Sequence, residues 1–350
     1  MGVVQNEFGT TQKGQKAYLY TLSNTGGMEV QVTNFGAILV SVKVKDSSSQ
    51  VKDVVLGYDS LKEYEKNEFF FGSTIGRNAN RIKDAVFSLD GKEYRLAVNE
   101  GPNNLHSDAD HGFHKVLWNA EVKENANAVT FCYASPDQEN GFPGNLNVSV
   151  TYSLSEDNAL SITYEGISDQ KTVMNMTNHS YFNLNGQGSG SICDEKVTIF
   201  ADGFTEVGEG SIPTGRIIPV EGTPLDFRSP RRVGDDIDDD FEQLNLVGGY
   251  DHNFALNSKG ETRAKAACVE DDRSGICMKV YTDLPGIQFY TGNFVKPHTG
   301  KNGAKYDKRG GLCLETQFFP NSINMPEFKQ PILEAGKKFT STTTYAFSVR

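Results

Sequence analysis

The chain has 350 residues, and its 45 acidic against 34 basic side chains give a formal net charge of −11 at pH 7. Nucleic acids and anionic membranes bind cationic protein surfaces, so this charge argues against both as partners. The hydrophobic content of 37% is typical of a folded globular protein, and the 35 glycines indicate many tight turns between short strands.

The first element along the chain is a short helix, predicted over residues 59–66. Asp59 or Ser60 is suited to cap its N-terminus, because both side chains accept hydrogen bonds from free backbone N–H groups. Leu61 and Tyr64 lie three positions apart and therefore face the same side of the helix, toward the interior. Other convincing helical patterns are scarce.

Alternation of apolar and polar residues with a period of two is typical of half-buried strands. This pattern recurs along the chain, most clearly in the segments 85–96, 146–164, 276–280 and 339–349. The polar stretch 155–158 interrupts the second segment and predicts a β-hairpin there. Asp90-Gly91 predicts another, because this pair suits the positive φ angles of a tight hairpin turn.

No linker rich in proline and serine interrupts the pattern, so we expect an all-β protein with one large antiparallel domain over residues 1–350. The most acidic segment, residues 235–240, offers oxygen ligands for calcium but lacks the spaced ligands and the glycine of a calcium loop. A solvated surface loop is the favoured interpretation, partly neutralised by Arg228, Arg231 and Arg232.

The N-terminal segment lacks the basic start, the apolar run and the cleavage site of a secretory signal, and no stretch of about 20 apolar residues follows it. The five cysteines are an odd number, widely spaced and without a C-x-x-C pair, which argues against a disulfide framework and against a zinc site. We therefore expect a cytoplasmic protein with free, mostly buried thiols.

Three of the six histidines, His106, His111 and His114, fall within segment 105–114. Their spacing fits no zinc signature, and Gly112 with two aspartates favours a loop over a metal site. Loops are where binding groups concentrate. We expect one functional histidine here among surface neighbours.

His179 lies in segment 174–184, where apolar side chains alternate with amide and hydroxyl side chains. A polar row on a strand must be hydrogen-bonded, and a ligand with many hydroxyls on a concave sheet would satisfy it. A hydrogen-bonded core histidine is the alternative.

Glu315 is the one carboxylate within the apolar segment 311–320. Carboxylates are almost never buried without a partner, so the sequence predicts a raised pKa and a chemical task, with a buried structural ion pair as the alternative. Asp251 and Gln288 are weaker signals. The common phosphate loop, dinucleotide fingerprint and nucleophile elbow do not occur in the sequence, which leaves acid–base chemistry on a neutral ligand.

Several segments, in order along nearly the whole chain, resemble the aldose 1-epimerase (galactose mutarotase) family. These segments are 75–82, 104–106, 112–118, 177–184, 250–254, 286–293 and 314–322. The resemblance implies a single large twisted antiparallel β-sandwich of the galactose mutarotase-like kind, with an open sugar-binding cleft. It also implies interconversion of the α and β anomers of free aldohexoses, with galactose or glucose as the usual substrate.

Carried over position by position, the resemblance implies that Glu315 is the general base and His179 the general acid. The residues that match sugar-binding positions of the family are Asn80, Arg81, His106, Ser180, Tyr181, Asp251 and Gln288. The reaction requires a base for the C1 hydroxyl and an acid for the ring oxygen, and we expect neither a metal nor another cofactor. A monomer or a weak homodimer is expected.

Three other functions remain as alternatives. A non-catalytic sugar-binding or sensing protein on the same scaffold would not need both Glu315 and His179. A glycoside hydrolase would use Asp251 and Glu315 as paired carboxylates. A hexose-phosphate epimerase would need a cationic pocket, and the arginine cluster at 228–232 lies outside the segments of the resemblance.

Overall fold

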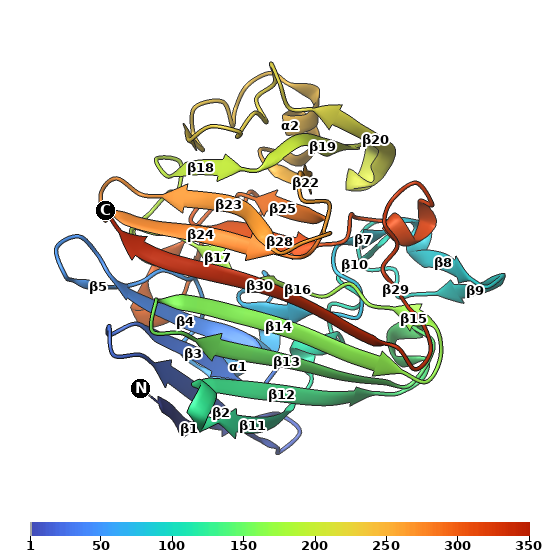
Figure 1. Cartoon of the computed structure of the whole chain (residues 1–350), viewed down its shortest axis with the longest axis horizontal. Coiled ribbons are helices and arrows are strands. Elements are labelled where there is room, and N and C mark those ends of the chain that lie inside the picture. The colour runs from blue at the N-terminus through green and yellow to red at the C-terminus, as the bar shows by residue number, and fades with distance from the viewer. Residues whose placement is uncertain (1) are drawn as a thin grey trace.

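The computed structural model describes residues 2–350, and the hairpin predicted at 146–164 forms its strands β13 (Leu146–Leu154) and β14 (Ala159–Ser168). Every second side chain of β13 is buried, because successive side chains of a strand point to opposite faces. Both strands belong to a nine-stranded antiparallel sheet that spans the molecule (Figure 1). The other strands of this sheet are β11 (Asn119–Lys123), β12 (Ala128–Ser135), β30 (Lys338–Val349), β24 (Ile276–Thr282), β23 (Ala264–Glu270), β18 (Lys196–Ile199) and β21 (Arg231–Arg232).

A six-stranded antiparallel sheet packs against the inner face of the nine-stranded sheet. Its strands, in order, are β17 (Tyr181–Phe182), β28 (Leu312–Gln317), β25 (Gly286–Tyr290), β22 (Asp251–Leu256), β19 (Ala201–Val207) and β20 (Pro213–Pro219). The rings of Phe182 and Tyr345 lie 5.0 Å apart between the two layers. The Tyr345 hydroxyl donates a hydrogen bond of 3.2 Å to the carbonyl of Leu314. The two sheets therefore share one continuous core.

A five-stranded sheet in simple sequence order completes the sandwich. Its strands are β1 (Gly2–Thr10), β2 (Lys16–Ser23), β3 (Glu29–Thr33), β4 (Ile38–Lys45) and β5 (Val51–Asp53). The Tyr152 hydroxyl of β13 donates a 2.7 Å hydrogen bond to the carbonyl of Ala37, which joins this sheet to the nine-stranded one. Val32, Val150 and Ile287 come from the three different sheets and lie in the same apolar cluster.

Short two-stranded ribbons connect the sheets and carry several loops. They pair β6 (Ser73–Ile75) with β16 (Thr177–His179), β7 (Arg81–Ile82) with β10 (Asn104–Leu105), β8 (Val86–Leu89) with β9 (Lys92–Arg95), β15 (Thr172–Val173) with β29 (Ile332–Leu333), and β26 (His298–Thr299) with β27 (Lys305–Tyr306). The turn between β8 and β9 has φ of 50° at Asp90 and 78° at Gly91, which confirms the predicted hairpin. Single 3₁₀ turns occur at Lys83–Ala85, Phe113–Lys115, Glu124–Ala126, Glu139–Gly141, Glu209–Ser211, Lys301–Gly303 and Ser322–Asn324.

The predicted helix is α1 (Leu61–Lys66), and Leu61 and Tyr64 are buried as expected. Ser60 caps it, and the Ser60 N–H in turn donates a 3.1 Å hydrogen bond to the carboxylate of Glu63. The sequence did not predict a second helix, α2 (Glu242–Val247), which ends at a left-handed Gly248.

The acidic segment 235–240 forms turns just before α2. Arg231 pairs with Asp236, which confirms part of the predicted neutralisation, and Arg309 pairs with Asp238 at 2.6 Å. Arg228 instead pairs with Asp226, outside the segment. Within residues 2–350, no helix is long and apolar enough to cross a membrane.

All five cysteines within residues 2–350 are unpaired. The expectation that most of them are buried is wrong, since only Cys277 and Cys313 are fully buried and Cys132 is exposed. The error follows from strand alternation, because Cys132 and Cys268 fall on positions of the nine-stranded sheet that face outward.

Candidate active site

A cleft of about 170 Å³ lies at one end of the six-stranded sheet, closed by the β6–β16 and β7–β10 ribbons. Its lining residues are Glu68, Phe69, Phe70, Asn80, Arg81, Glu100, Leu105, His106, His179, Tyr181, Asp251, Gln288, Tyr290, Phe294 and Glu315. Eight of the nine site residues predicted from the sequence are among them. The cleft therefore gathers side chains from positions 68 to 315 of the chain.

Ser180 is the predicted site residue that does not line the cleft. It lies between His179 and Tyr181, and adjacent side chains of an extended chain point to opposite sides. The Ser180 hydroxyl accordingly donates a hydrogen bond to the side chain of Asn178, away from the cleft. The predicted polar row thus divides into residues that face the cleft and residues that hold the fold together.

Strand register places the polar side chains of the six-stranded sheet beside each other. Gln288 of β25 lies directly opposite Glu315 of β28, and Asp251 of β22 lies opposite Tyr290. The Gln288 amide donates a 2.7 Å hydrogen bond to Asp251 Oδ1. Glu315 is 2% exposed, and its Oε2 has no hydrogen-bond partner among residues 2–350. A buried, unpartnered carboxylate oxygen is costly for the fold and points to a task beyond stability.

His179 faces Glu315 from the end of β16, with its Nε2 3.8 Å from Glu315 Oε1. This separation is longer than a hydrogen bond, so neither group satisfies the other. Burial lowers the pKa of His179 to about 4. Burial also raises the pKa of Glu315 well above its ordinary value, and the Asp251 carboxylate adds to this while Arg81 opposes it. The predicted raised pKa of Glu315 is therefore confirmed.

Arg81 supplies positive charge at the other side of the cleft. Its guanidinium donates two hydrogen bonds of 2.7 Å to the two carboxylate oxygens of Glu100 and lies 4.0 Å from Asp251 Oδ2. Burial lowers the pKa of Arg81, but the Asp251 charge and the Glu100 pair outweigh burial, so the pKa is raised overall. This fixed cation partly offsets the charge of the nearby carboxylates.

His106 is held by the backbone of Asn80, with which it shares two hydrogen bonds. The Asn80 N–H donates to His106 Nδ1 at 3.2 Å, and the His106 N–H donates to the Asn80 carbonyl at 3.1 Å. Because Nδ1 accepts a hydrogen bond, the proton of the neutral ring lies on Nε2. Burial, followed by the charges of His179 and Arg81, lowers the pKa of His106, so the ring stays a neutral donor.

His106, His179 and Glu315 lie close enough together to be considered as metal ligands. Metal-bound histidines donate their second ring nitrogen to an acceptor, whereas Nδ1 of His106 faces an N–H donor. Nε2 of His106 carries the proton and has no free lone pair for a metal ion. The arrangement does not fit a metal centre.

Phe70 is the most informative residue that the sequence did not predict. Its ring stacks on His179 at 5.8 Å and meets the edges of His106 at 5.1 Å and His114 at 5.0 Å. The only sequence signal was the aromatic run 69–71 directly after the predicted helix. Phe70 packs apolar surface against His179 and therefore contributes to its desolvation.

The remaining residues of the 105–114 segment differ from expectation at one position. His111 is exposed, as predicted for a surface neighbour. His114 is buried, and its Nε2 bonds to the carbonyl of Ala109 at 3.1 Å. Burial lowers the pKa of His114 to about 3, so it is a structural neutral ring behind Phe70.

Arg77 lies in the same segment as Asn80 and Arg81 but has a structural role. It is 1% exposed, and its guanidinium donates to the carbonyl of Pro143 at 2.8 Å and to the hydroxyls of Ser135 and Thr172. Segment 75–82 therefore carries one arginine for the fold and one for the cleft.

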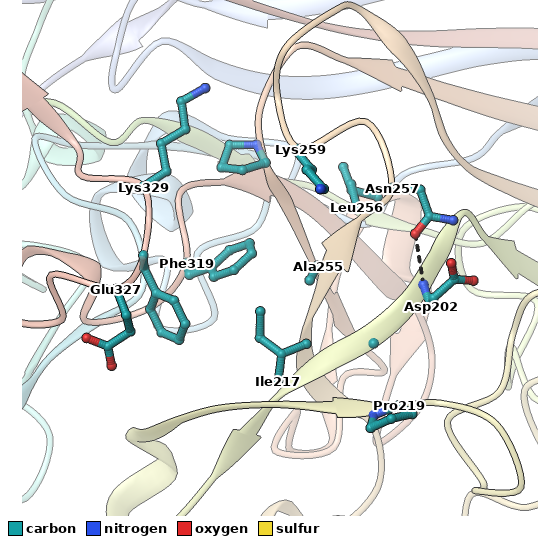
Figure 2. Close-up of a pocket in the computed structure, with 13 residues that line it drawn as sticks. Asp202, Ile217, Pro219, Ala255, Leu256, Asn257, Lys259, Phe319, Glu327 and Lys329 are labelled. Carbon is teal, nitrogen blue, oxygen red and sulfur yellow. Dashed lines mark hydrogen bonds between the residues drawn. The ribbon is translucent and has the colours of Figure 1, made fainter.

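A second cavity of about 630 Å³ lies on the other end of the six-stranded sheet and is mainly apolar (Figure 2). Ile217, Ala255 and Phe319 face it, while Asp202 and Glu327 lie at its edges in Figure 2. No histidine is among its described lining residues. It is larger than the cleft around Glu315, but no histidine–carboxylate pair like His179 and Glu315 occurs among its described lining residues.

Comparison with known proteins agrees with this chemistry. Residues 18–346 match the family model described as aldose 1-epimerase. The chain belongs to the aldose 1-epimerase family. Galactose mutarotase from Sus scrofa is 43% identical over 350 residues, covering 100% of this chain and 99% of that protein. Aldose 1-epimerase from Escherichia coli K12 is 39% identical over 336 residues, covering 95% and 96% of the two chains.

Solved structures of the aldose 1-epimerase family are similar over the whole chain. An aldose epimerase homologue from C. elegans has a TM-score of 0.87 at 30% identity and covers 95% of this chain and 99% of its own. Galactose 1-epimerase from Lactobacillus acidophilus has a TM-score of 0.85 at 27% identity and covers 99% and 98%. The predictions of an all-β sandwich and of an isomerase that interconverts aldose anomers are confirmed.

Proposed function

We propose that Glu315 and His179 are the general base and general acid of this aldose 1-epimerase, acting on free galactose and glucose. The observation that carries the proposal is the 3.8 Å separation of His179 Nε2 and Glu315 Oε1 inside a buried cleft. The C1 hydroxyl and the ring oxygen of an aldose are both bonded to C1. An acid and a base that serve both atoms must therefore lie close together.

In the forward half of the reaction, ionised Glu315 removes the proton from the C1 hydroxyl while protonated His179 donates a proton to the ring oxygen. The C1–O5 bond breaks and leaves an open-chain aldehyde. Rotation about C1–C2 exposes the other face of the carbonyl. On reclosure, Glu315 returns its proton to the carbonyl oxygen and neutral His179 takes the proton of the attacking hydroxyl.

The pKa shifts of the ligand-free cleft favour the second of these two proton arrangements. Burial disfavours both charged forms, so the proton rests on Glu315 and His179 is neutral. This distribution is the one that complements the open-chain aldehyde. The two arrangements hold the same number of protons, so sugar binding has only to move one proton between the pair.

We propose that the other polar groups of the cleft bind the sugar hydroxyls and the ring oxygen. His106 presents an Nε2–H donor, Arg81 presents guanidinium N–H groups, and Asp251 presents carboxylate oxygens that accept from hydroxyls. Asn80, Tyr181 and Gln288 are the other predicted ligands whose side chains line the same cleft. Directional hydrogen bonds of this kind hold the C1 hydroxyl beside the base and the ring oxygen beside the acid.

A phosphorylated sugar is a weaker candidate for the substrate. Arg81 is the only cation among the described cleft residues, and Glu100 already engages it in two hydrogen bonds. Glu68 and Asp251 add negative charge that opposes a phosphate. A glycoside hydrolase is also disfavoured, because the family model and the relatives that match this chain are described as aldose 1-epimerase or galactose mutarotase.

Polarimetry of freshly dissolved α-glucose and α-galactose tests the proposal. We expect the protein to accelerate the approach to anomeric equilibrium of both sugars, and the ratios of kcat/KM across galactose, glucose, xylose and arabinose to define the preferred sugar. If the protein binds sugar saturably but the optical rotation decays no faster than in the buffer blank, the protein is a sugar-binding protein instead. Release of an aryl alcohol from aryl glycosides would favour the hydrolase.

We further propose that the whole chain acts as one cytoplasmic domain, as a monomer or a weak homodimer. The five unpaired thiols support a reducing compartment. The cleft is lined by acid, base and polar ligands from one chain, so activity does not require a second copy.

A further inference from the structure

Two cysteines and a glutamate lie together on the nine-stranded sheet, near the C-terminus of the chain and on different strands from the cleft (Figure 1). Cys268 and Glu270 belong to β23, and Cys277 belongs to the neighbouring β24. Val269 and Met278 alternate with them and point into the core. The three polar side chains therefore occupy the opposite, outer face of the sheet.

The three donor atoms form a nearly regular triangle. Cys268 Sγ lies 3.5 Å from Cys277 Sγ, and the two sulfur atoms lie 3.9 Å and 4.0 Å from Glu270 Oε1. A point equidistant from three atoms so spaced lies about 2.2 Å from each, close to the zinc–sulfur distance of about 2.3 Å and the zinc–oxygen distance of about 2.0–2.2 Å. One metal ion thus fits all three donors without movement of the strands.

Positive charge beside the triangle favours the thiolate form that binds metals. Lys279 lies directly opposite Cys268 in the strand ladder, on the same face of the sheet. The two cysteines bind as thiolates, so a metal ion releases thiol protons on binding.

A disulfide between the two cysteines fits the geometry less well. Cys268 lies opposite Lys279 in the ladder, and Cys277 lies opposite Glu270, so the cysteines are two residues out of register. Diagonal neighbours of this kind have Cα atoms about 7–8 Å apart, beyond the usual disulfide range of about 4.4–6.8 Å. The same offset is no obstacle to a metal ion, because the ion itself spans the gap between the sulfur atoms.

We propose that Cys268, Cys277 and Glu270 form a binding site for one thiophilic divalent ion of the Zn²⁺ type. The guanidinium of Arg350, the last residue and 58% exposed in its side chain, now pairs with Glu270 Oε1. The metal ion replaces this arginine as the partner of the carboxylate. Three protein ligands leave the fourth position of a tetrahedral zinc site to a water molecule.

Titration of the reduced full-length protein with Cd²⁺ alone tests the site, because thiolate–cadmium bonds give a strong ultraviolet charge-transfer band. We expect the band to saturate at one equivalent, and Zn²⁺ to compete it away. Loss of an outer-shell partner alone weakens metal binding about 10–100-fold, so Cys268→Ser and Cys277→Ser are each expected to weaken it more than 100-fold. Glu270→Gln is expected to weaken it about tenfold or more.

Cys132→Ser is the matched control, because Cys132 is an exposed thiol on the same sheet, outside the triangle. We expect it to bind Cd²⁺ like the unmodified protein. All four variants are expected to keep their mutarotation rate, which reports that each is folded. Absence of a band at one equivalent, or a band that persists in both Cys268→Ser and Cys277→Ser, would overturn the site. Neither result bears on the roles of Glu315 and His179.

Discussion

Replacement of Glu315 by glutamine separates the catalytic cost of this carboxylate from its structural cost. The glutamine has the same shape but cannot remove a proton from the C1 hydroxyl. General acid–base catalysis contributes about 10²–10⁴-fold, so kcat is expected to fall by that factor, equivalent to about 2.7–5.5 kcal/mol of transition-state stabilisation. Polarimetry at saturating sugar measures the loss directly.

The same substitution is expected to stabilise the protein at neutral and alkaline pH. The pKa of Glu315 is raised above its ordinary value of 4.5, so its contribution to stability is intact below pH 4.5 and is lost as pH rises through the folded-state pKa. For each pH unit by which the folded-state pKa exceeds the unfolded-state pKa, ionisation costs the fold about 1.4 kcal/mol. With an unfolding entropy of about 2.1 cal/mol/K per residue, a chain of this length gains about 2 °C in Tm for each such increment that the substitution removes.

Thermal unfolding of Glu315→Gln and unmodified protein between pH 4.5 and 9 tests this reasoning. We expect the two Tm values to agree at the acid end and to diverge in favour of the variant as pH rises. Glu195→Gln is the matched control, since Glu195 is a fully buried carboxyl with a raised pKa outside the cleft. It is expected to show the stability trend with full activity. Unchanged turnover in the Glu315→Gln variant would show that Glu315 is not the base. A Tm of the variant that falls relative to the unmodified protein as pH rises would refute the burial argument.

Three further outcomes follow from the geometry of the cleft. The pH profile of kcat/KM is expected to be bell-shaped. Its acid limb should lie near the His179 pKa of about 4, and its alkaline limb should follow the raised pKa of Glu315. An acid limb near 6.5 would contradict the desolvation of His179. Phe70→Ala admits water beside His179, so the acid limb should move to higher pH, and an unmoved limb would show that the stacked ring does not desolvate the imidazole. Gln288→Leu removes the hydrogen bond to Asp251 and should lower kcat/KM about tenfold in steady-state kinetics. A loss as large as that of Glu315→Gln would give Gln288 a role beyond binding.

Local signals in the sequence predicted local structure well. Ser60 and Leu61 marked the start of α1, and Asp90-Gly91 marked the β8–β9 turn, because both features depend on interactions within a few residues. The helix α2 was missed because it follows an acidic segment and because Phe241, which precedes it, is not a residue that caps helices. Its stability comes from packing rather than from a strong sequence pattern.

The sequence by itself determined the strands and the family. It also identified Glu315 as a buried carboxylate, because its immediate neighbours in the chain are apolar. The segments that resemble the family also contained the polar residues that line the cleft. The sequence did not separate Ser180 from His179, since the choice between the two sides of a strand depends on which side meets the core.

Only the tertiary structure decided which groups act on one another. Glu315 and His179 are 136 positions apart, yet strand register and the β6–β16 ribbon set their facing atoms at 3.8 Å. Phe70 enters from a loop that no periodic pattern describes. The opposite pKa shifts of the acid and the base arise from the burial that this assembly creates, because desolvation depends on all neighbours in space rather than on neighbours along the chain.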